Sequence, residues 1–191
     1  MNGPDTLAPL IGSVALLERA VTYTLGGLQL VTPTAFDRPT PCSEWDLQAL
    51  LHHMDDSLTA LDEALDTGHV PLDPITPTSD VLCTLRTRAT RLLGAWTSAL
   101  DRDLIDIEGC PLSTSVVMAA GAIEIAAHGW DVGQACGADR PLPRELADDL
   151  LVLSPLFVTQ ADRGVRFAAP VPTNSHATPT DRLVAFLGRQ P

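Results

Sequence analysis

The sequence predicts an all-α fold in which four long helices form a bundle, followed by a short helical and extended tail. Apolar residues recur at spacings of three and four along four stretches, which is the pattern of amphipathic helices. Segments containing proline or glycine separate these stretches. The fourth stretch is apolar nearly all the way round, which is typical of a helix in the middle of a bundle.

The four helices are expected at Leu7 to about Leu30, after Ser43 to about Thr67, Thr78 to about Leu100, and Thr114 to about Ala135. Ser43 stands three residues before Asp46, so we expect it to cap the second helix. Gly68 follows that helix and marks its end. The stretch LIDIEGCPLSTS, before the fourth helix, is expected to be a short irregular or extended connection.

The tail begins with a shorter helix, from about Arg144 to Leu156. A proline-bearing extended passage, FAAPVPTNSHATPT, follows, and the chain then forms a terminal helical turn or two over TDRLVAFLGR. This passage is too short to link two domains. We therefore expect one domain over residues 1–191, with the bundle at about 7–136 and the tail at about 137–191 packed on it.

Composition restricts the function. The chain has 12 basic and 24 acidic residues, and a formal net charge of -12. This surface disfavours nucleic-acid binding, which depends on cationic contacts. Every basic residue is Arg, so catalysis through a lysine Schiff base is excluded.

The chain start lacks the basic residues of a secretory signal, and no apolar run approaches a membrane span. We therefore expect a cytoplasmic protein, a monomer or homodimer, with no membrane partner. Without export, scattered cysteines are expected to be free thiols. They are Cys42, Cys83, Cys110 and Cys136.

Glu124 and His128 are four residues apart, so they lie on one face of the fourth helix, one turn from each other. Their neighbours within a turn are almost all apolar, so a carboxylate and an imidazole there need compensation. One reading is a buried hydrogen-bonded pair, joined by an arginine from another helix. The other is metal binding.

The second helix supplies a third candidate ligand. His53 lies at the flank of its apolar arc, beside small residues, whereas His52 points further away. Taken alone, such a histidine is more often a satisfied core or boundary residue than a ligand. With Glu124 and His128 it forms a His/Glu/His set that suits Zn²⁺, with a coordination position left open for water or substrate. The spacing is not that of HExxH proteases.

Other residues have both a functional and a packing interpretation. Asp131 could accept the ring N–H of a ligand histidine, or be a solvated helix residue. Arg86 forms a basic cluster with Arg88 and Arg91, which is expected to pair with surface acids or, less simply, to clamp a substrate carboxylate.

In the tail, His176 could reach the cleft, as could Asn174. Trp45 and Trp130 are expected to be packing residues. Cys42 lies near a helix start, where a thiolate is favoured, but nothing else marks it as a nucleophile.

Three stretches in this order, DRPTPCSEWDLQALLHHM, EIAAHGWDVGQACG and DRLVAFLGRQP, resemble the DinB-like metal-binding superfamily. Within it they are similar to the branch related to mycothiol-dependent maleylpyruvate isomerase. The resemblance implies a four-helix bundle that holds a divalent metal, usually zinc, with Ni²⁺ or another divalent ion as alternatives. It matches His53, Glu124 and His128 to the family's ligands.

The resemblance also implies an enzyme that uses mycothiol or a similar thiol as cosubstrate, a transferase or isomerase acting on a small electrophilic metabolite. The isomerase has an additional C-terminal domain where this chain has a short tail, so we expect a related reaction and not maleylpyruvate isomerisation. Two alternatives remain open. One is thiol-independent cyclisation, ring opening or hydrolysis in specialised metabolism, and the other is a non-catalytic metal-binding bundle.

Overall fold

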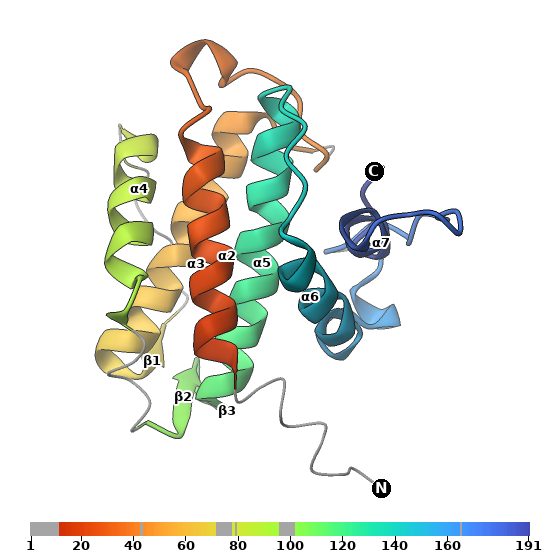
Figure 1. Cartoon of the computed structure of the whole chain (residues 1–191). Helices are drawn as coiled ribbons and strands as arrows, with labels where there is room; N and C mark the ends of the chain where they lie inside the picture. Colours follow the sequence, from red (N-terminus) through yellow and green to blue (C-terminus); the bar gives the residue numbers. More distant parts are fainter. Residues whose placement is uncertain (1–11, 43, 72–77, 79, 96–101, 165) are drawn as a thin grey trace, which may run out of the picture.

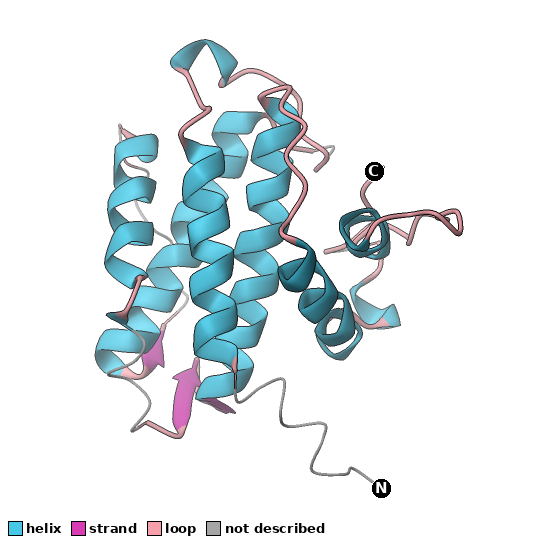
Figure 2. Ribbon diagram, viewed as in Figure 1, coloured by secondary structure: helices cyan, strands magenta, loops and turns pink. Residues whose placement is uncertain are grey.

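The computed structural model describes residues 12–42, 44–71, 78, 80–95, 102–164 and 166–191. Within them the protein is mostly helical, with one small sheet (Figure 1, Figure 2). The helices are α2 (Ser13–Leu28), α3 (Leu47–Thr67), α4 (Val81–Leu92), α5 (Thr114–Ala135), α6 (Arg144–Phe157) and α7 (Pro179–Phe186). The strands are β1 (His69–Val70), β2 (Leu104–Ile107) and β3 (Cys110–Ser113). Short 3₁₀ turns occupy Pro33–Ala35 and Gln160–Asp162.

The first four of these helices lie side by side and enclose the largest part of the core. Helix α2 packs along α5, α3 contacts both α4 and α5, and α4 also contacts α2. Helices α6 and α7 lie beyond α5, on the side away from α4 (Figure 1). The tail is therefore packed against the helix that carries Glu124 and His128.

The expectation of an all-α fold was wrong in one respect, because the connection before α5 forms a sheet. Strands β2 and β3 pair antiparallel, and β1 pairs parallel with β2 (Figure 2). The hairpin turns through Glu108 and Gly109, whose φ angles are 47° and 82°. Positive φ at both turn residues is the geometry of a tight hairpin. The sequence pattern missed the sheet because Glu-Gly is not a strong turn signal and β1 has only two residues.

The expected third helix was too long. Helix α4 begins after Asp80, whose side chain accepts a hydrogen bond from the Cys83 N–H, and it ends at Leu92. Leu93 is extended, and Gly94 has a φ of 77°, so the chain leaves the helix there. Residues 96–100 of the expected helix, and residues 7–11 of the first, lie outside the described residues.

The second helix is capped by Asp46 and not by the expected Ser43. The Asp46 carboxylate accepts a hydrogen bond of 2.8 Å from the Ala49 N–H, and the helix begins at Leu47. Its end at Gly68, where φ is 72°, is confirmed. Ser43 itself lies outside the described residues. The fourth helix has the expected bounds.

The arginine cluster on α4 joins that helix to its neighbours. Arg88 donates to the buried Asp55 at 2.9 Å, and Arg91 lies 3.0 Å from the buried Asp62, so both acids of α3 are paired. Arg86 donates instead to the backbone oxygen of Leu28, at the end of α2. The expectation of pairing with surface acids is confirmed for Arg91, which also contacts the exposed Asp66 at 2.6 Å, whereas the partners of Arg88 are buried.

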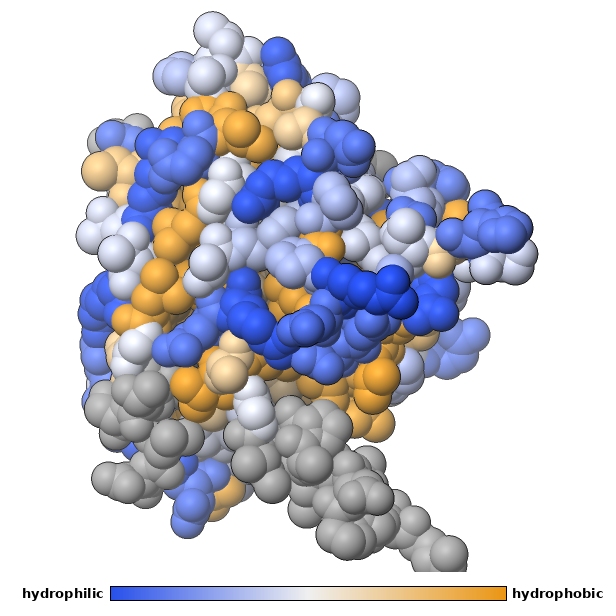
Figure 3. All heavy atoms as spheres, in the orientation of Figure 1, coloured by the Kyte–Doolittle hydropathy of each residue, from blue (hydrophilic) through white to orange (hydrophobic). Residues whose placement is uncertain are grey.

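The surface is polar with scattered apolar patches on the face drawn in Figure 3. Five large apolar side chains are exposed among the described residues, and they come from several elements: Leu30, Leu93, Leu104, Val152 and Leu156. None of the described helices has the length and apolar character needed to cross a membrane.

Close packing of α2 on α5 depends on Gly129. The Thr24 hydroxyl donates to the backbone oxygen of Ile125 at 2.8 Å, which places α2 within touching distance of α5. A methyl group added at Gly129 would clash with Thr24, including its backbone. Gly129 directly follows His128 in the sequence, so the contact between α2 and α5 lies next to this histidine.

We therefore expect Gly129→Ala to lower the free energy of unfolding by about 1–3 kcal/mol, because the two helices must separate. Gly133→Ala is a matched control on the same helix, since the nearest atom to its added methyl would lie 3.7 Å away. We expect that control to be neutral or slightly stabilising, since alanine favours the helix. Urea denaturation measures both changes. Equal stability of the two variants would contradict the packing described.

Candidate functional site

The predicted ligand set comes together where α3 crosses α5. His53 Nε2 lies 2.6 Å from Glu124 Oε1, and His128 Nε2 lies 3.2 Å from the same oxygen. One donor atom from each of the three residues lies within 4.8 Å of the others. His52, the other histidine of the pair on α3, is not part of this group. The helix-face argument therefore selected the histidine that faces α5.

Two further side chains, those of Ser57 and Trp45, contact these three residues. The Ser57 hydroxyl donates to Glu124 Oε1 at 3.2 Å, from one turn further along α3. The Trp45 ring centroid lies 4.5 Å from that of His53 and 5.9 Å from that of His128. Trp45 was expected to be a packing residue. It does pack, but against the two imidazoles of the site.

Asp131 orients His128. The Asp131 Oδ2 atom lies 2.9 Å from His128 Nδ1, and Asp131 is completely buried. A carboxylate at Nδ1 accepts the proton of that nitrogen, so the Nε2 side of the ring faces Glu124. Of the two interpretations of Asp131, the one in which it accepts a histidine N–H matches the structure.

Arg189, near the end of the chain, neutralises Asp131. Its Nη2 and Nε atoms donate to the two carboxylate oxygens at 2.8 and 3.2 Å. Its Nη2 also lies 3.3 Å from Cys42 Sγ. The turn after α7 makes this reach possible, because Gly188 has a φ of 87° and an added methyl would lie 2.8 Å from the Ala168 oxygen.

Charge coupling dominates the electrostatics of the site. Burial by itself would raise the pKa of Glu124, but the charge of His128 and hydrogen bonds from both histidines outweigh it and hold this pKa well below its usual range. Burial would lower the pKa of His128, yet Glu124 and Asp131 raise it well above its ordinary value. Each of these two groups therefore stabilises the charged form of the other, and a metal ion bound by His128 would take the place of the Nε2 proton.

A second donor group overlaps the first. Cys42, His128 and Asp131 also bring one donor atom each within 4.8 Å of one another. The Arg189 guanidinium contacts both Cys42 and Asp131, however, so a cation bound there would face a fixed positive charge. Among the described residues, no arginine lies within hydrogen-bonding distance of the His53, Glu124 and His128 donor atoms, so this group is the better cation site of the two.

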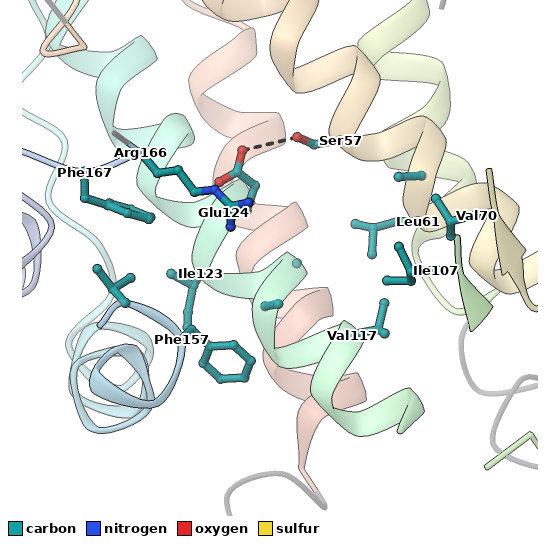
Figure 4. A pocket seen from close by; sticks show the side chains of 14 residues that line it. Ser57, Leu61, Val70, Ile107, Val117, Ile123, Glu124, Phe157, Arg166 and Phe167 are labelled. Atoms are coloured by element: carbon teal, nitrogen blue, oxygen red, sulfur yellow. Dashed lines mark hydrogen bonds between the residues drawn. The ribbon is translucent and has the colours of Figure 1, made fainter. Parts of the chain in front are cut away.

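A cavity of about 440 Å³ opens beside Glu124 (Figure 4). Its walls come from α3, α5, the sheet and the tail, and most of its lining side chains are apolar. Glu124 and Ser57 line it together with Arg166, which extends from the tail towards Glu124 in Figure 4. Glu124 thus connects the candidate ligand set to a space that could hold a small molecule.

The segment that contains the candidate ligands matches a known protein family. Residues 17–133 match the model of the mycothiol maleylpyruvate isomerase N-terminal domain, which is more than half of the chain and contains the whole predicted ligand set. The chain belongs to this family. The tail, with Arg166 and Arg189, lies outside the matched segment.

Two curated relatives in this comparison come from Mycobacterium tuberculosis. They are the uncharacterized protein MT0763 of strain CDC 1551 and the uncharacterized protein Rv0738 of strain H37Rv. The chain is similar to each at 27% identity over 162 residues, which cover 79% of this chain and 83% of the relative. No solved structure matches the chain significantly.

Two of the predicted helpers lie outside the site of this family member. Arg86 contacts the end of α2, as described above. His176 is exposed in a turn of the tail, where its backbone N–H donates to the Asn174 side chain at 2.8 Å. Neither residue lines the cavity beside Glu124.

Sequence reasoning gave no role to Arg189 and Arg166, and dismissed Cys42. Arg189 stands in the DRLVAFLGRQP stretch that carries part of the family resemblance, which is the one signal that could have singled it out. Cys42 likewise stands in the PTPCSEW turn. For Arg166 the sequence offers no comparable signal, because only the folded tail brings it to the cavity.

We expect Arg189→Gln to lower the free energy of unfolding by about 3–5 kcal/mol, because it leaves the buried Asp131 carboxylate without its main counter-charge. Arg182→Gln is the matched control, on α7, where the arginine is exposed and lies 3.9 Å from Asp148. We expect that change to cost less than about 1 kcal/mol. Urea denaturation measures both.

The double variant Arg189→Gln/Asp131→Asn tests the cause. If the unpaired charge is responsible, removing the carboxylate restores part of the lost stability. Equal stabilities of Arg189→Gln and Arg182→Gln would show that Asp131 does not need this partner.

Proposed function

We propose that this protein is a divalent-metal-dependent enzyme, with His53, Glu124 and His128 as the metal ligands. It acts with a low-molecular-weight thiol of the mycothiol type on a small electrophilic substrate, as a transferase or isomerase. The single observation that carries the proposal is the convergence of these three donor groups at the edge of a cavity.

The donor set fits a divalent cation. Two imidazole nitrogens and one carboxylate oxygen suit Zn²⁺, and three protein ligands leave room for a further one. Glu124 supplies an ionised oxygen, and Asp131 keeps the His128 Nε2 atom turned towards it. Glu124 also lines the cavity, so a metal ion held by this set would lie beside a space where a substrate can bind.

The surrounding side chains prepare the site for chemistry. Trp45 covers the two imidazoles and limits their rotation and their contact with water. Ser57 holds Glu124 from the α3 side, and the apolar cavity walls strengthen electrostatic interactions by excluding water. These groups bind and orient the substrate.

A bound divalent ion would lower the pKa of a thiol or water and polarise a carbonyl group. The family to which the chain belongs is named for a mycothiol-dependent isomerase, and this supports a thiol as the second reactant. The absence of lysine is consistent with this choice, because no amine nucleophile is available.

The proposal includes the finer architecture. We take α2, α3, α4 and α5 as the four-helix bundle of a DinB-like fold, and residues 1–191 as one domain with the tail packed on it. The contacts of α6 with α5 and α2 support this interpretation. Zn²⁺ is our first choice of metal, since the donor set combines nitrogen and oxygen ligands.

We expect the wild-type protein to bind about one equivalent of Zn²⁺ per chain. His53→Ala should lose this ion, or weaken its binding by more than about 10- to 100-fold, which is the typical effect of losing a residue that only hydrogen-bonds to a ligand. His52→Ala is the matched control, one residue away on α3. Elemental analysis after gel filtration gives the stoichiometry, and competition with a chelator gives the affinity.

Stoichiometric Zn²⁺ on His53→Ala as well as on the control His52→Ala would remove the basis for this site. His128→Ala provides a second check, since its ring contacts Glu124 from within α5, whereas His53 contacts it from α3. Retention of metal by His53→Ala and His128→Ala together would overturn the ligand assignment, whatever the activity of the protein.

We expect the metal-loaded protein to accelerate the reaction of mycothiol with at least some members of a panel of small electrophiles. In an addition, the sulfur–carbon bond forms and the thiol proton moves to the electrophile, so the product mass equals the sum of the reactants. In a substitution, the thiol proton departs with the leaving group, and the product is lighter by the mass of both. Mass spectrometry detects these conjugates, with the protein-free reaction and His128→Ala as controls. Equal rates with and without the protein across the panel would count against the thiol-dependent reaction.

A further inference from the structure

The cavity beside Glu124 has two chemically different ends. Its polar end is formed by Ser57, Glu124 and Arg166 (Figure 4). Its other end is formed by apolar side chains from four separate elements: Leu61 of α3, Val70 of β1, Ile107 of β2 and Val117 of α5. A ligand that matches this space must therefore have one polar group and an apolar body.

Arg166 determines the sign of that polar group. It is one of two charged side chains among the lining residues, and the other, Glu124, is already bound by His53, His128 and Ser57. Arg166 has a weak partner in Asp162, 3.8 Å away, and its side chain is 77% exposed. Its guanidinium is therefore available to an anionic ligand.

The partner of Arg166 is itself engaged elsewhere. The other Asp162 oxygen accepts hydrogen bonds from the Thr159 N–H and hydroxyl at 2.9 and 2.7 Å. Asp162 is thus held in a local turn, whereas the guanidinium of Arg166 extends into the view of the cavity (Figure 4). An incoming carboxylate would offer a better hydrogen-bonding partner than this distant contact.

We propose that the cavity binds a small organic acid with an apolar body. Its carboxylate pairs with Arg166 near Glu124, and its apolar part lies against the end lined by Val117 and Ile107. This proposal deepens the proposed function and rests on it, because the acid is the substrate of the same site. Aliphatic and aromatic walls suit the apolar body of such an acid better than they suit a strongly polar sugar-linked thiol.

Three probes separate the contributions of charge and apolar body: phenylacetate, its neutral analogue phenethyl alcohol, and acetate. We expect phenylacetate to bind the protein about two- to fivefold more tightly than the alcohol, since the paired arginine is exposed. Acetate, without the ring, should bind at least about tenfold more weakly than phenylacetate. Isothermal titration calorimetry measures all three, with and without added Zn²⁺.

Arg166→Gln should abolish the preference for the acid over the alcohol while leaving binding of the alcohol unchanged. Arg144→Gln, at another exposed arginine, is the control and should keep the preference. Ala120→Leu fills part of the cavity from α5 and should weaken binding of both ring-containing probes. Circular dichroism confirms that each variant is folded.

The proposal is overturned if neither ring-containing probe binds, if acid and alcohol bind equally, or if Arg166→Gln keeps the preference. These failures differ from a failure of the proposed function. Stoichiometric Zn²⁺ without selective acid binding would retain the metal site and reject the acid. Selective acid binding without Zn²⁺ binding would support the acid site and reject the metal-dependent reaction.

Discussion

The charge of Asp131 is the constraint on which the site depends. This carboxylate is completely buried on a helix that is apolar nearly all round, and an uncompensated charge there would cost several kcal/mol. Burial raises its pKa, but the hydrogen bond from His128 and the charge of Arg189 outweigh that effect and hold the pKa below its usual value. The protein meets the constraint by bringing Arg189 of the tail to the C-terminal part of α5.

This solution also fixes the candidate ligand set. Since Asp131 is held by Arg189 on one side, its other interaction, with His128 Nδ1, has a defined direction. The imidazole then presents Nε2 to Glu124, and Glu124 in turn meets His53 across the helix interface. A chain of charge-assisted hydrogen bonds thus runs from the end of the chain to α3. Such connected polar networks are stable in a core only when every member is satisfied.

The spacing of apolar residues in the sequence predicted those features of the structure that depend on helix geometry alone. The bounds of α5 and the i, i+4 placement of Glu124 and His128 follow from helical periodicity, and the apolar arc of α3 selected His53. The sheet, the early end of α4 and the Asp46 cap depend on turn geometry that periodicity does not encode. The pair Arg189 and Asp131 is separated by 58 residues, so only tertiary packing brings it together.

The tail therefore acts on both sides of the candidate ligand set. On the His128 side of the set, Arg189 neutralises the carboxylate that orients His128. On the Glu124 side, Phe157, Arg166 and Phe167 complete the wall of the cavity that Glu124 also lines. The segment matched to the family, residues 17–133, contains all three proposed ligands but none of these tail residues. The proposed metal ligands and the proposed acid-binding arginine thus come from different parts of the chain. A change in the tail can alter ligand selection through the cavity wall while the proposed ligands stay in place, provided that Arg189 is kept.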